Sequence, residues 1–414
     1  MKNGGFPKRT LRDVPLRAKT VLLRVDYNVP LDDDGTVADD YRIRASLPTI
    51  RALLKESCKI VIISHLGRPQ GKTEARLSLE PAAQRLAELI KEPVRFVDRT
   101  IGPKVAMAIK RAPGRSIIVL ENLRFSPGEE ADDMAFARQL ARDSRADYFI
   151  QDGFGVVHRA HASTHAIAQY LPGVAGLLLE REYRTLTEVM HHPVRPLVAV
   201  IGGAKVDDKL DALKVFAETA DTIVLGGAMA NTFLAYNGNF MGSSIYEPNC
   251  REAIRDIYEH TQQTAGKSAA GAHLIVPVDV GVGTSLGKAA TRQDVSAKAI
   301  PAGAMALDLG PASVAVMRKA VSRAKTVIWN GTLGAAEVPA FAAGSAALAD
   351  ELIAHPEIIS VIGGGDTVDF VRRRDKKRGG SFTHVSTGGG ASLALMSGAK
   401  LPGVDALLDA PRRL

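Results

Sequence analysis

The chain has 414 residues, of which 46% are apolar and 24% are charged. A single hydrophobic core stops growing at roughly 250–300 residues, so this length predicts two domains, and the composition excludes a fibrous or disordered chain. The formal net charge of +8 favours acidic partners, but the densest basic run, residues 372–378, contains no aromatic side chain. We interpret that run as a solvated helix end and expect no nucleic acid as a partner.

The sequence also allows predictions about cellular location and metal binding. The opening residues contain no apolar core, and no apolar run is long enough to span a membrane, so we expect a soluble, cytoplasmic protein without a membrane partner. Cys58 and Cys250 stand alone, with no CxxC or Cys/His spacing around them. This fits a reducing compartment and predicts no structural metal.

Short β-branched runs alternate with helical patterns along the whole chain, which indicates βαβ units and parallel sheets. In the first half we expect strands at Val21–Val25, Lys59–Ser64, Ser116–Leu120 and Tyr148–Ile150. In the second half we expect them at Leu197–Ile201, Thr222–Leu225, Leu274–Val278, Thr326–Trp329, Ile358–Ile362 and His384–Ser386.

Helices are expected between these strands, and one of them lies midway along the chain. The apolar spacing of Leu177–Met190 suits one face of a helix that ends before Pro193. A core helix would show the same pattern, but the position favours a connecting role. The predicted fold class is α/β, with two doubly wound, Rossmann-like parallel-sheet domains joined by this interdomain helix.

Polar residues follow the first-half strands, where ligands bind in open α/β sheets. Arginines recur in these segments or could face the same crevice, and a guanidinium fork matches carboxylate and phosphate oxygens, so we expect a small ligand with several negative charges. The candidates are Arg24, Asp26, Asn28, Arg42, His65, Arg68, Arg124, Arg159 and His161. For the two histidines we expect ligand contact rather than acid–base chemistry.

Glycine clusters follow five of the second-half strands. Glycine lets the backbone approach a ligand closely, and amides at a helix start hold phosphate oxygens, so we expect a nucleotide site. The clusters contain Gly202, Gly203, Gly226, Gly227, Gly331, Gly334, Gly363, Gly364, Gly365, Gly388, Gly389 and Gly390. No GxxxxGK[ST] is present, and Gly281-Val282-Gly283 lacks the third glycine of a dinucleotide fingerprint, so neither a P-loop enzyme nor a typical dehydrogenase is expected.

Taken together, these segments resemble the phosphoglycerate kinase family. The resemblance runs from about Leu11 to Leu408 and rests on motifs in both halves: RVDYNVP at 24–30, SHLGRP at 64–69, ENLRF at 121–125, HRAH at 158–161, GGAKV at 202–206, GGGDT at 363–367, STGGGAS at 386–392 and LPGVD at 401–405.

The resemblance implies a domain organisation and a reaction. Residues 1–180 would bind 3-phosphoglycerate or 1,3-bisphosphoglycerate, residues 181–397 would bind ADP or ATP with Mg²⁺, and the tail 398–414 would return to the first domain. The family's enzymes are implied to be glycolytic and monomeric. Because acid and nucleotide would bind to different domains, we expect direct in-line transfer after domain closure.

The resemblance also assigns residues. Substrate-binding positions would be Asp26, Asn28, Arg42, His65, Arg68, Arg124 and Arg159. Nucleotide-binding positions would be Gly203, Lys205, Lys209, Gly227, Asn330, Glu337, Gly363, Gly364, Gly365, Asp366 and Thr367, with Asp366 holding the metal. As catalytic groups that stabilise the transferring phosphoryl we expect Arg42, Lys205 and the backbone at Gly388 and Gly389.

Two stretches differ from the amino-acid sequence that is usual in the family. Asn330-Gly-Thr-Leu-Gly-Ala-Ala-Glu337 stands for Asn-Gly-Pro-Val-Gly-Val-Phe-Glu, and Gln151-Asp-Gly153 stands for Asn-Asp-Ala; neither change removes a charged residue. Two alternatives remain: a dehydrogenase-like nucleotide enzyme, disfavoured by the missing fingerprint, and a catalytically silent scaffold of the same fold. The retained Lys205 and Asp366 argue against the scaffold.

Overall fold

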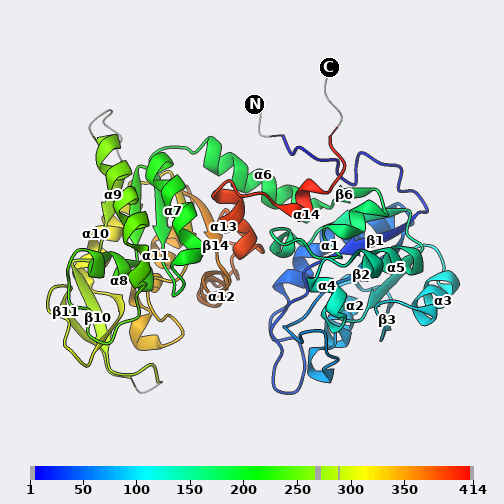
Figure 1. Ribbon diagram of the computed structural model, residues 1–414, viewed down its shortest axis with the longest axis horizontal. Helices are drawn as coiled ribbons and strands as arrows, with labels where there is room; N and C mark the ends of the chain where they lie inside the picture. Colours follow the sequence, from blue (N-terminus) through cyan, green and yellow to red (C-terminus); the bar gives the residue numbers. More distant parts are fainter. Residues whose placement is uncertain (1–4, 266–271, 288–289, 411–414) are drawn as a thin grey trace. The chain divides into compact units, whose positions relative to one another are not determined.

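The computed structural model describes residues 5–265, 272–287 and 290–410. The chain divides into two compact units (Figure 1). Unit 1 comprises the chain up to Arg184 together with the segment from Lys400 on, and unit 2 comprises Thr185–Ala399. Helix α6 (Leu177–His191) carries the chain from unit 1 into unit 2.

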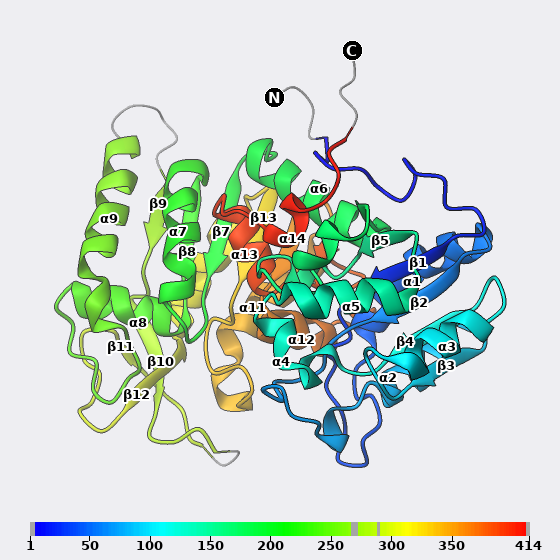
Figure 2. The ribbon, with the colours of Figure 1, turned by 45° about the vertical axis from the view of Figure 1, so that its right-hand side comes forward.

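Unit 1 contains one sheet of six parallel strands in the order β3-β4-β2-β1-β5-β6. The strands are β1 (Thr20–Arg24), β2 (Lys59–Ile63), β3 (Val94–Val97), β4 (Ile117–Leu120), β5 (Tyr148–Gln151) and β6 (Gly173–Ala175). Besides the first part of α6, the helices are α1 (Tyr41–Lys55), α2 (Glu80–Ile90), α3 (Pro103–Arg111), α4 (Pro127–Glu130), α5 (Met134–Ser144) and α14 (Pro402–Asp405). Helices α2 and α3 lie beside the edge strand β3 (Figure 2).

The strands of unit 1 are buried on both faces, as parallel sheets require. On one face, Leu23 and Ile62 pack in a single cluster with Ile50 of α1 and Leu86 of α2. The side chains that alternate with them, such as Leu22, are also fully buried. This double burial explains why these strands read as continuous apolar runs in the sequence.

The segment of residues 403–410 packs on the rest of unit 1. The Gly403 amide donates to the carbonyl of Val157 at 2.9 Å, and the Leu408 amide donates to the carbonyl of Gly173 at 2.9 Å. Lys8 forms an ion pair of 2.7 Å with Asp409. The segment that precedes β1 and the segment that follows α14 therefore lie side by side.

Unit 2 contains a second six-stranded parallel sheet in the order β15-β14-β13-β7-β8-β9. The strands are β7 (Leu197–Ile201), β8 (Thr222–Leu225), β9 (His273–Ile275), β13 (Thr326–Asn330), β14 (Ile359–Gly363) and β15 (His384–Val385). The helices are α7 (Asp207–Thr219), α8 (Gly227–Tyr236), α9 (Arg251–Ala265), α10 (Pro311–Val321), α11 (Ala343–Ala354), α12 (Gly365–Arg374) and α13 (Gly390–Met396). The predicted fold class, with two parallel-sheet α/β domains joined by a helix, is confirmed.

The sequence prediction did not include a small antiparallel sheet in unit 2. Its strands are β10 (Asp279–Gly283), β11 (Gln293–Ser296) and β12 (Met305–Leu309), in the order β11-β10-β12. Gly281 and Gly283, which resembled an incomplete dinucleotide fingerprint, lie in β10. Within the described part of the chain, no helix is long and apolar enough to cross a membrane.

Candidate functional site

The predicted polar residues of unit 1 follow four strands that are neighbours in the sheet. These strands have the order β4-β2-β1-β5, so their carboxyl ends form one continuous edge. The loops after them contain Asn122 and Arg124, His65 to Arg68, Asp26 to Asn28, and Asp152 to His161, respectively. Segments that are far apart in the sequence therefore meet at one edge of one sheet, as ligand sites do in open α/β sheets.

Asp26, Asn28 and Arg42 form one hydrogen-bonded group. Nη1 of Arg42, from the first turn of α1, donates to the Asn28 carbonyl at 2.9 Å and lies 3.3 Å from the Asp26 carboxylate. The Asn28 side chain in turn accepts from the Gly67 amide at 2.9 Å. A cavity of about 390 Å³ opens beside Asn28 and Gly67. The structure thus brings together residues from the loops after β1 and β2 next to open space.

His65 lies in this group as a neutral side chain. Its exposed fraction is 4%, and burial, together with the positive charge of Arg24, holds its pKa well below the ordinary value. Nη2 of Arg24 lies 3.3 Å from His65 Nδ1. Because arginine can only donate, Nδ1 must accept and the ring proton must sit on Nε2. His65 is therefore a neutral donor through Nε2, which agrees with a role in ligand contact.

Arg124 is almost fully buried, whereas Arg68 and Arg159 are exposed. Nη1 of Arg124 donates to the Gly67 carbonyl at 2.7 Å, and Nε lies 3.0 Å from the Glu130 carboxylate. Nε of Arg159 donates to His158 Nε2 at 3.1 Å. Burial, with Arg159 nearby, lowers the pKa of His158 to about 4, so this histidine is a neutral acceptor that holds the Arg159 guanidinium.

Arg24 differs from the other arginines because it points inward. Its side chain is 1% exposed, and its three nitrogens contact Ser163, the Val25 carbonyl and His65. Beneath it lies Glu129, a fully buried carboxylate that sequence reasoning missed. The only signal was a Glu-Glu pair after Pro127-Gly128, which is typical of an exposed turn.

In unit 2, the glycine clusters also follow neighbouring strands. They occur after β15, β14, β13, β7 and β8, five consecutive members of the sheet order. The Gly203 amide donates to the Thr332 carbonyl at 2.7 Å, and the Ala228 amide donates to the Gly203 carbonyl at 3.1 Å. The loops after β7, β8 and β13 therefore touch one another through their backbones.

Several of these contacts leave no room for a side chain. Gly203, Gly227 and Gly331 have φ angles of +94°, +58° and +92°. A Cβ on Gly331 would also overlap the Gly202 carbonyl. Glycine is required here by both backbone conformation and close approach. The helices α7, α8 and α12 begin within a few residues of these loops, so their free amides lie at the same edge.

Asn330, at the end of β13, has a side chain that the protein does not satisfy. Its exposed fraction is 1%, yet neither its amide nitrogen nor its oxygen has a hydrogen-bond partner in the described residues. Buried polar atoms normally have partners, so this amide fits a contact that a ligand supplies. Glu337, seven residues later along the loop, is exposed.

The two predicted lysines have different surroundings. Lys205 is exposed just before α7. Lys209 is 9% exposed, and its ammonium donates to the Gly202 carbonyl. In this structure Lys205 is the freely accessible cation, whereas Lys209 supports the first glycine loop.

Asp366 is the candidate metal ligand. It is an exposed carboxylate in the first turn of α12, directly after Gly363, Gly364 and Gly365. Thr367 beside it is buried, and its hydroxyl accepts from the Gly331 amide at 2.9 Å. Among the described residues, no three His, Cys, Asp or Glu side chains form a metal-binding group. One carboxylate beside a phosphate site is what Mg²⁺ uses when substrate phosphates complete its shell, so the residues fit this ion.

Gly388 and Gly389 lie between β15 and α13. The Gly388 amide donates to Ser386 Oγ at 3.0 Å, and the Ser386 hydroxyl is 2.7 Å from Ser392 Oγ in the first turn of α13. Gly389 has a φ angle of +50°. The turn is therefore fixed by serine hydroxyls, and it follows the strand next to β14.

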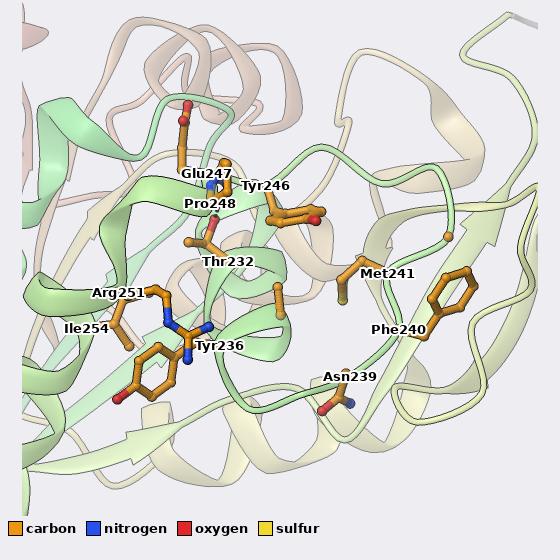
Figure 3. Close-up of a pocket in the computed structure, with 12 residues that line it drawn as sticks. Thr232, Tyr236, Asn239, Phe240, Met241, Tyr246, Glu247, Pro248, Arg251 and Ile254 are labelled. Atoms are coloured by element: carbon orange, nitrogen blue, oxygen red, sulfur yellow. Dashed lines mark hydrogen bonds between the residues drawn. The ribbon is translucent and has the colours of Figure 1, made fainter.

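A separate cavity of about 310 Å³ is lined by Thr232 and Tyr236 (Figure 3), which lie in the second half of α8, whereas Gly227 is its first residue. Arg251 stands 5.4 Å from the ring centre of Tyr236 on its wall, and Phe240 and Tyr246 are exposed beside it. None of the predicted nucleotide residues lines this cavity. It is therefore not part of the glycine-loop site.

The fold and the two sheet edges define the class: a two-unit α/β enzyme with loops of the kind that hold phosphorylated ligands. Comparison with known proteins gives the family, because residues 11–399 match the family model described as phosphoglycerate kinase. The chain belongs to the phosphoglycerate kinase family and is a phosphotransferase.

Curated relatives and solved structures agree. The phosphoglycerate kinase of Chloroflexus aggregans is 42% identical over 97% of this chain and 99% of its own. That of Desulforapulum autotrophicum is 45% identical over 96% of this chain and 100% of its own. The solved phosphoglycerate kinase from Coxiella burnetii has a TM-score of 0.79 at 32% identity, with 97% of this chain and 98% of that chain covered.

Proposed function

We propose that this enzyme catalyses reversible, Mg²⁺-dependent phosphoryl transfer between 1,3-bisphosphoglycerate and ADP, giving 3-phosphoglycerate and ATP. It would serve glycolysis and gluconeogenesis as a cytoplasmic monomer. Family membership supports the kinase activity and the adenine nucleotide co-substrate. The metal, the pathway, the location and the residue roles are our proposals.

One observation supports the assignment of the 3-phosphoglycerate site to unit 1: cationic side chains from the loops and the helix that follow neighbouring strands lie at a single sheet edge. We assign the substrate to Asp26, Asn28, Arg42, His65, Arg68, Arg124 and Arg159. The exposed guanidinium groups of Arg68 and Arg159 suit carboxylate and phosphate oxygens, and the buried Arg124 fixes the turn at Gly67, directly before Arg68.

In unit 2, we assign the nucleotide to the glycine loops. The amides near Gly203 and Gly227 would hold phosphate oxygens, and the unpaired amide of Asn330 would meet the ligand from the end of β13. Lys205, Lys209, Glu337, Thr367 and the glycines 363–365 complete this assignment. Asp366 is the residue that we assign to hold Mg²⁺, which when bound would neutralise the charge of the nucleotide phosphates.

The chemistry requires no general base. The acceptor is a carboxylate with a pKa of about 3.5–4, so it is ionised at neutral pH and can attack in line. The enzyme's task is to position the reactants and to stabilise the charge on the transferring group. We assign that stabilisation to Arg42, Lys205 and the backbone at Gly388 and Gly389.

Because the acid and the nucleotide are assigned to different units, transfer would need the units to close around both substrates and exclude water. Small-angle scattering should then show a smaller radius of gyration with 3-phosphoglycerate and a magnesium nucleotide together than with either alone. An unchanged radius with both substrates bound would contradict closure.

A coupled assay with 3-phosphoglycerate, ATP and magnesium tests the proposed function. We expect turnover that requires both substrates and that chelation of the metal abolishes. Nucleotide binding without turnover would instead favour the silent scaffold.

A further inference from the structure

Glu129 is a buried carboxylate beneath the cationic edge of unit 1. It lies in α4 with an exposed fraction of 0%. Oε1 accepts from the Ser163 hydroxyl at 2.6 Å, and Oε2 accepts from the Ser163 amide at 3.1 Å. The backbone carbonyl of Glu129 also accepts from the Ala162 amide at 2.9 Å. One residue therefore fixes the loop that follows His161 by three hydrogen bonds.

The same carboxylate balances a buried cation. Nη2 of Arg24 lies 3.9 Å from Glu129 Oε1, and both side chains are 1% exposed. Nε of Arg24 donates to Ser163 Oγ at 2.8 Å, and that hydroxyl donates to Glu129. This gives a relay from Arg24 through Ser163 to Glu129. A buried charge without a partner is costly, so Arg24 depends on this carboxylate.

Arg24 in turn determines what His65 offers to a ligand. Its Nη2 donates to His65 Nδ1, which leaves the ring proton on Nε2. Nδ1 of His161 lies 4.0 Å from Glu129 Oε1, and burial, with Arg24 nearby, lowers the pKa of His161 to about 4. The chain of contacts from Glu129 thus reaches His65, a predicted ligand residue in the loop after β2, and the segment next to Arg159.

Several groups around Glu129 are cations or hydrogen-bond donors. Burial raises its pKa, whereas Arg24, Ser163 and Arg124 act in the opposite direction. A negative charge under an anion site weakens the long-range attraction for an anion, so the presence of Glu129 is not explained by ligand electrostatics. The hydrogen bonds of Glu129 to Ser163 and its ion pair with Arg24 explain its presence, because they hold these groups in place.

We propose that Glu129 is a positioning residue for the acid substrate, which acts through Arg24 and Ser163 to hold His65 and the 159–163 segment in their binding arrangement. This inference rests on the proposed function of unit 1. Glu129 itself does not touch the substrate.

The test is the Glu129→Gln variant, which keeps the shape and removes the charge. We expect the KM for 3-phosphoglycerate and its Kd, measured by calorimetry without nucleotide, to rise about tenfold or more, while the KM for ATP stays within about twofold. A purely electrostatic role predicts the opposite sign, because the variant makes the site more positive. An unchanged or lower Kd for 3-phosphoglycerate in the folded variant would overturn the proposal.

Two further variants keep the test decisive. Ser163→Ala breaks the relay but leaves the charges of Arg24 and Glu129, so this variant should fold. It should raise the Kd for 3-phosphoglycerate by about threefold, and it provides the test if Glu129→Gln does not fold. A double-mutant cycle combines Glu129→Gln with His65→Ala. The loss of affinity for 3-phosphoglycerate in the double variant should be smaller than the sum of the losses in the two single variants. Additive losses would contradict action through His65.

The matched control is Asp143→Asn in α5. Asp143 is another buried carboxylate of unit 1 that accepts from the Gly102 amide at 2.7 Å and from Nε of Arg142 at 3.1 Å, and neither residue is a predicted substrate-binding position. Asp143→Asn should lower the stability of the protein without changing the Kd for 3-phosphoglycerate.

The outcomes distinguish this inference from the proposed function. If the unmodified enzyme shows no turnover in the coupled assay, the proposed function fails. If it turns over and Glu129→Gln binds 3-phosphoglycerate normally, only the positioning role of Glu129 fails.

Discussion

The two sheet edges of this molecule present different kinds of groups to a ligand. In unit 1 the edge consists of charged side chains, such as Arg42 and Arg124, which are held by carboxylates, carbonyls and neutral histidines. In unit 2 it consists mainly of backbone, because loops at Gly203 and Gly331 approach so closely that side chains are excluded. The first edge should therefore respond to changes of charge and pH, and the second to an added methyl group.

The largest expected effect concerns Lys205, the exposed lysine just before α7 in unit 2. Lys205→Ala should lower kcat by about 10²–10³-fold, the usual loss when one donor to a transition state is removed. Nucleotide affinity should change by only about threefold, because the glycine loops remain. Steady-state kinetics and nucleotide titration measure both quantities.

Lys214→Ala, on the exposed surface of α7, is the control for this variant and should leave kcat unchanged. Normal turnover in Lys205→Ala would remove Lys205 from the catalytic role.

The next effect tests the backbone edge. Gly331→Ala places a methyl group against the Gly202 carbonyl at a φ angle of +92°. Such strain costs about 1–3 kcal/mol, so the Kd for ADP should rise by about five- to 150-fold while the Kd for 3-phosphoglycerate stays constant. Gly303→Ala, which has open space and an ordinary φ, should bind ADP normally. Equal behaviour of the two alanine variants would contradict the requirement for glycine.

The stability of unit 1 should depend on pH through Asp152. Burial raises the pKa of Asp152 to about 7, although its Oδ1 accepts from the Leu178 amide at the start of α6. Its folded pKa lies above the unfolded value, so its stabilisation is complete below about pH 4 and is lost as the pH rises through 7. From pH 5 to pH 7 this amounts to roughly 2 kcal/mol at 1.36 kcal/mol for each pKa unit.

Urea unfolding followed by circular dichroism at several pH values measures this loss. Asp152→Asn, which mimics the protonated side chain, should lose less stability over that range than the unmodified chain. Trp329, the one tryptophan of the sequence, is buried in β13, so its fluorescence reports unit 2 as an internal comparison. An identical pH dependence in both proteins would contradict the raised pKa.

The smallest expected effect concerns Arg68, one of the exposed arginines at the sheet edge of unit 1. Arg68→Ala should raise the Kd for 3-phosphoglycerate by about tenfold, because one exposed guanidinium is lost while the buried network remains. Arg68→Lys should recover only part of this affinity, since an ammonium lacks the planar fork. Arg138→Ala, on the exposed side of α5, should have no effect on calorimetric titrations.

The main strands and the ligand loops could be predicted because they depend on short-range patterns. Leu197–Ile201 is apolar at each position since both faces of a parallel strand are buried, and its bounds agree with β7. The short strand β3 was missed because Val94–Val97 includes a charged, exposed Arg95. The antiparallel sheet was missed because Gly281 and Gly283 interrupt the apolar pattern of β10.

Chemical roles were harder to predict where they depend on tertiary contacts. The arginines after β1, β2 and β4 could be grouped because parallel strands end at the same edge. Nothing local distinguishes the inward-facing Arg24 from the others, or the buried Glu129 from the exposed Glu130 beside it. The family resemblance supplied residue roles, and these stay predictions until ligands are tested.

Hydrogen exchange with each ligand alone tests the central claim most directly. If the acid belongs to unit 1 and the nucleotide to unit 2, 3-phosphoglycerate should slow exchange in the loops at residues 26–28, 65–68 and 159–163, and magnesium ADP should slow it at 202–206, 226–228 and 330–333. Protection of the same unit by both ligands would contradict the division of binding between the two sheets.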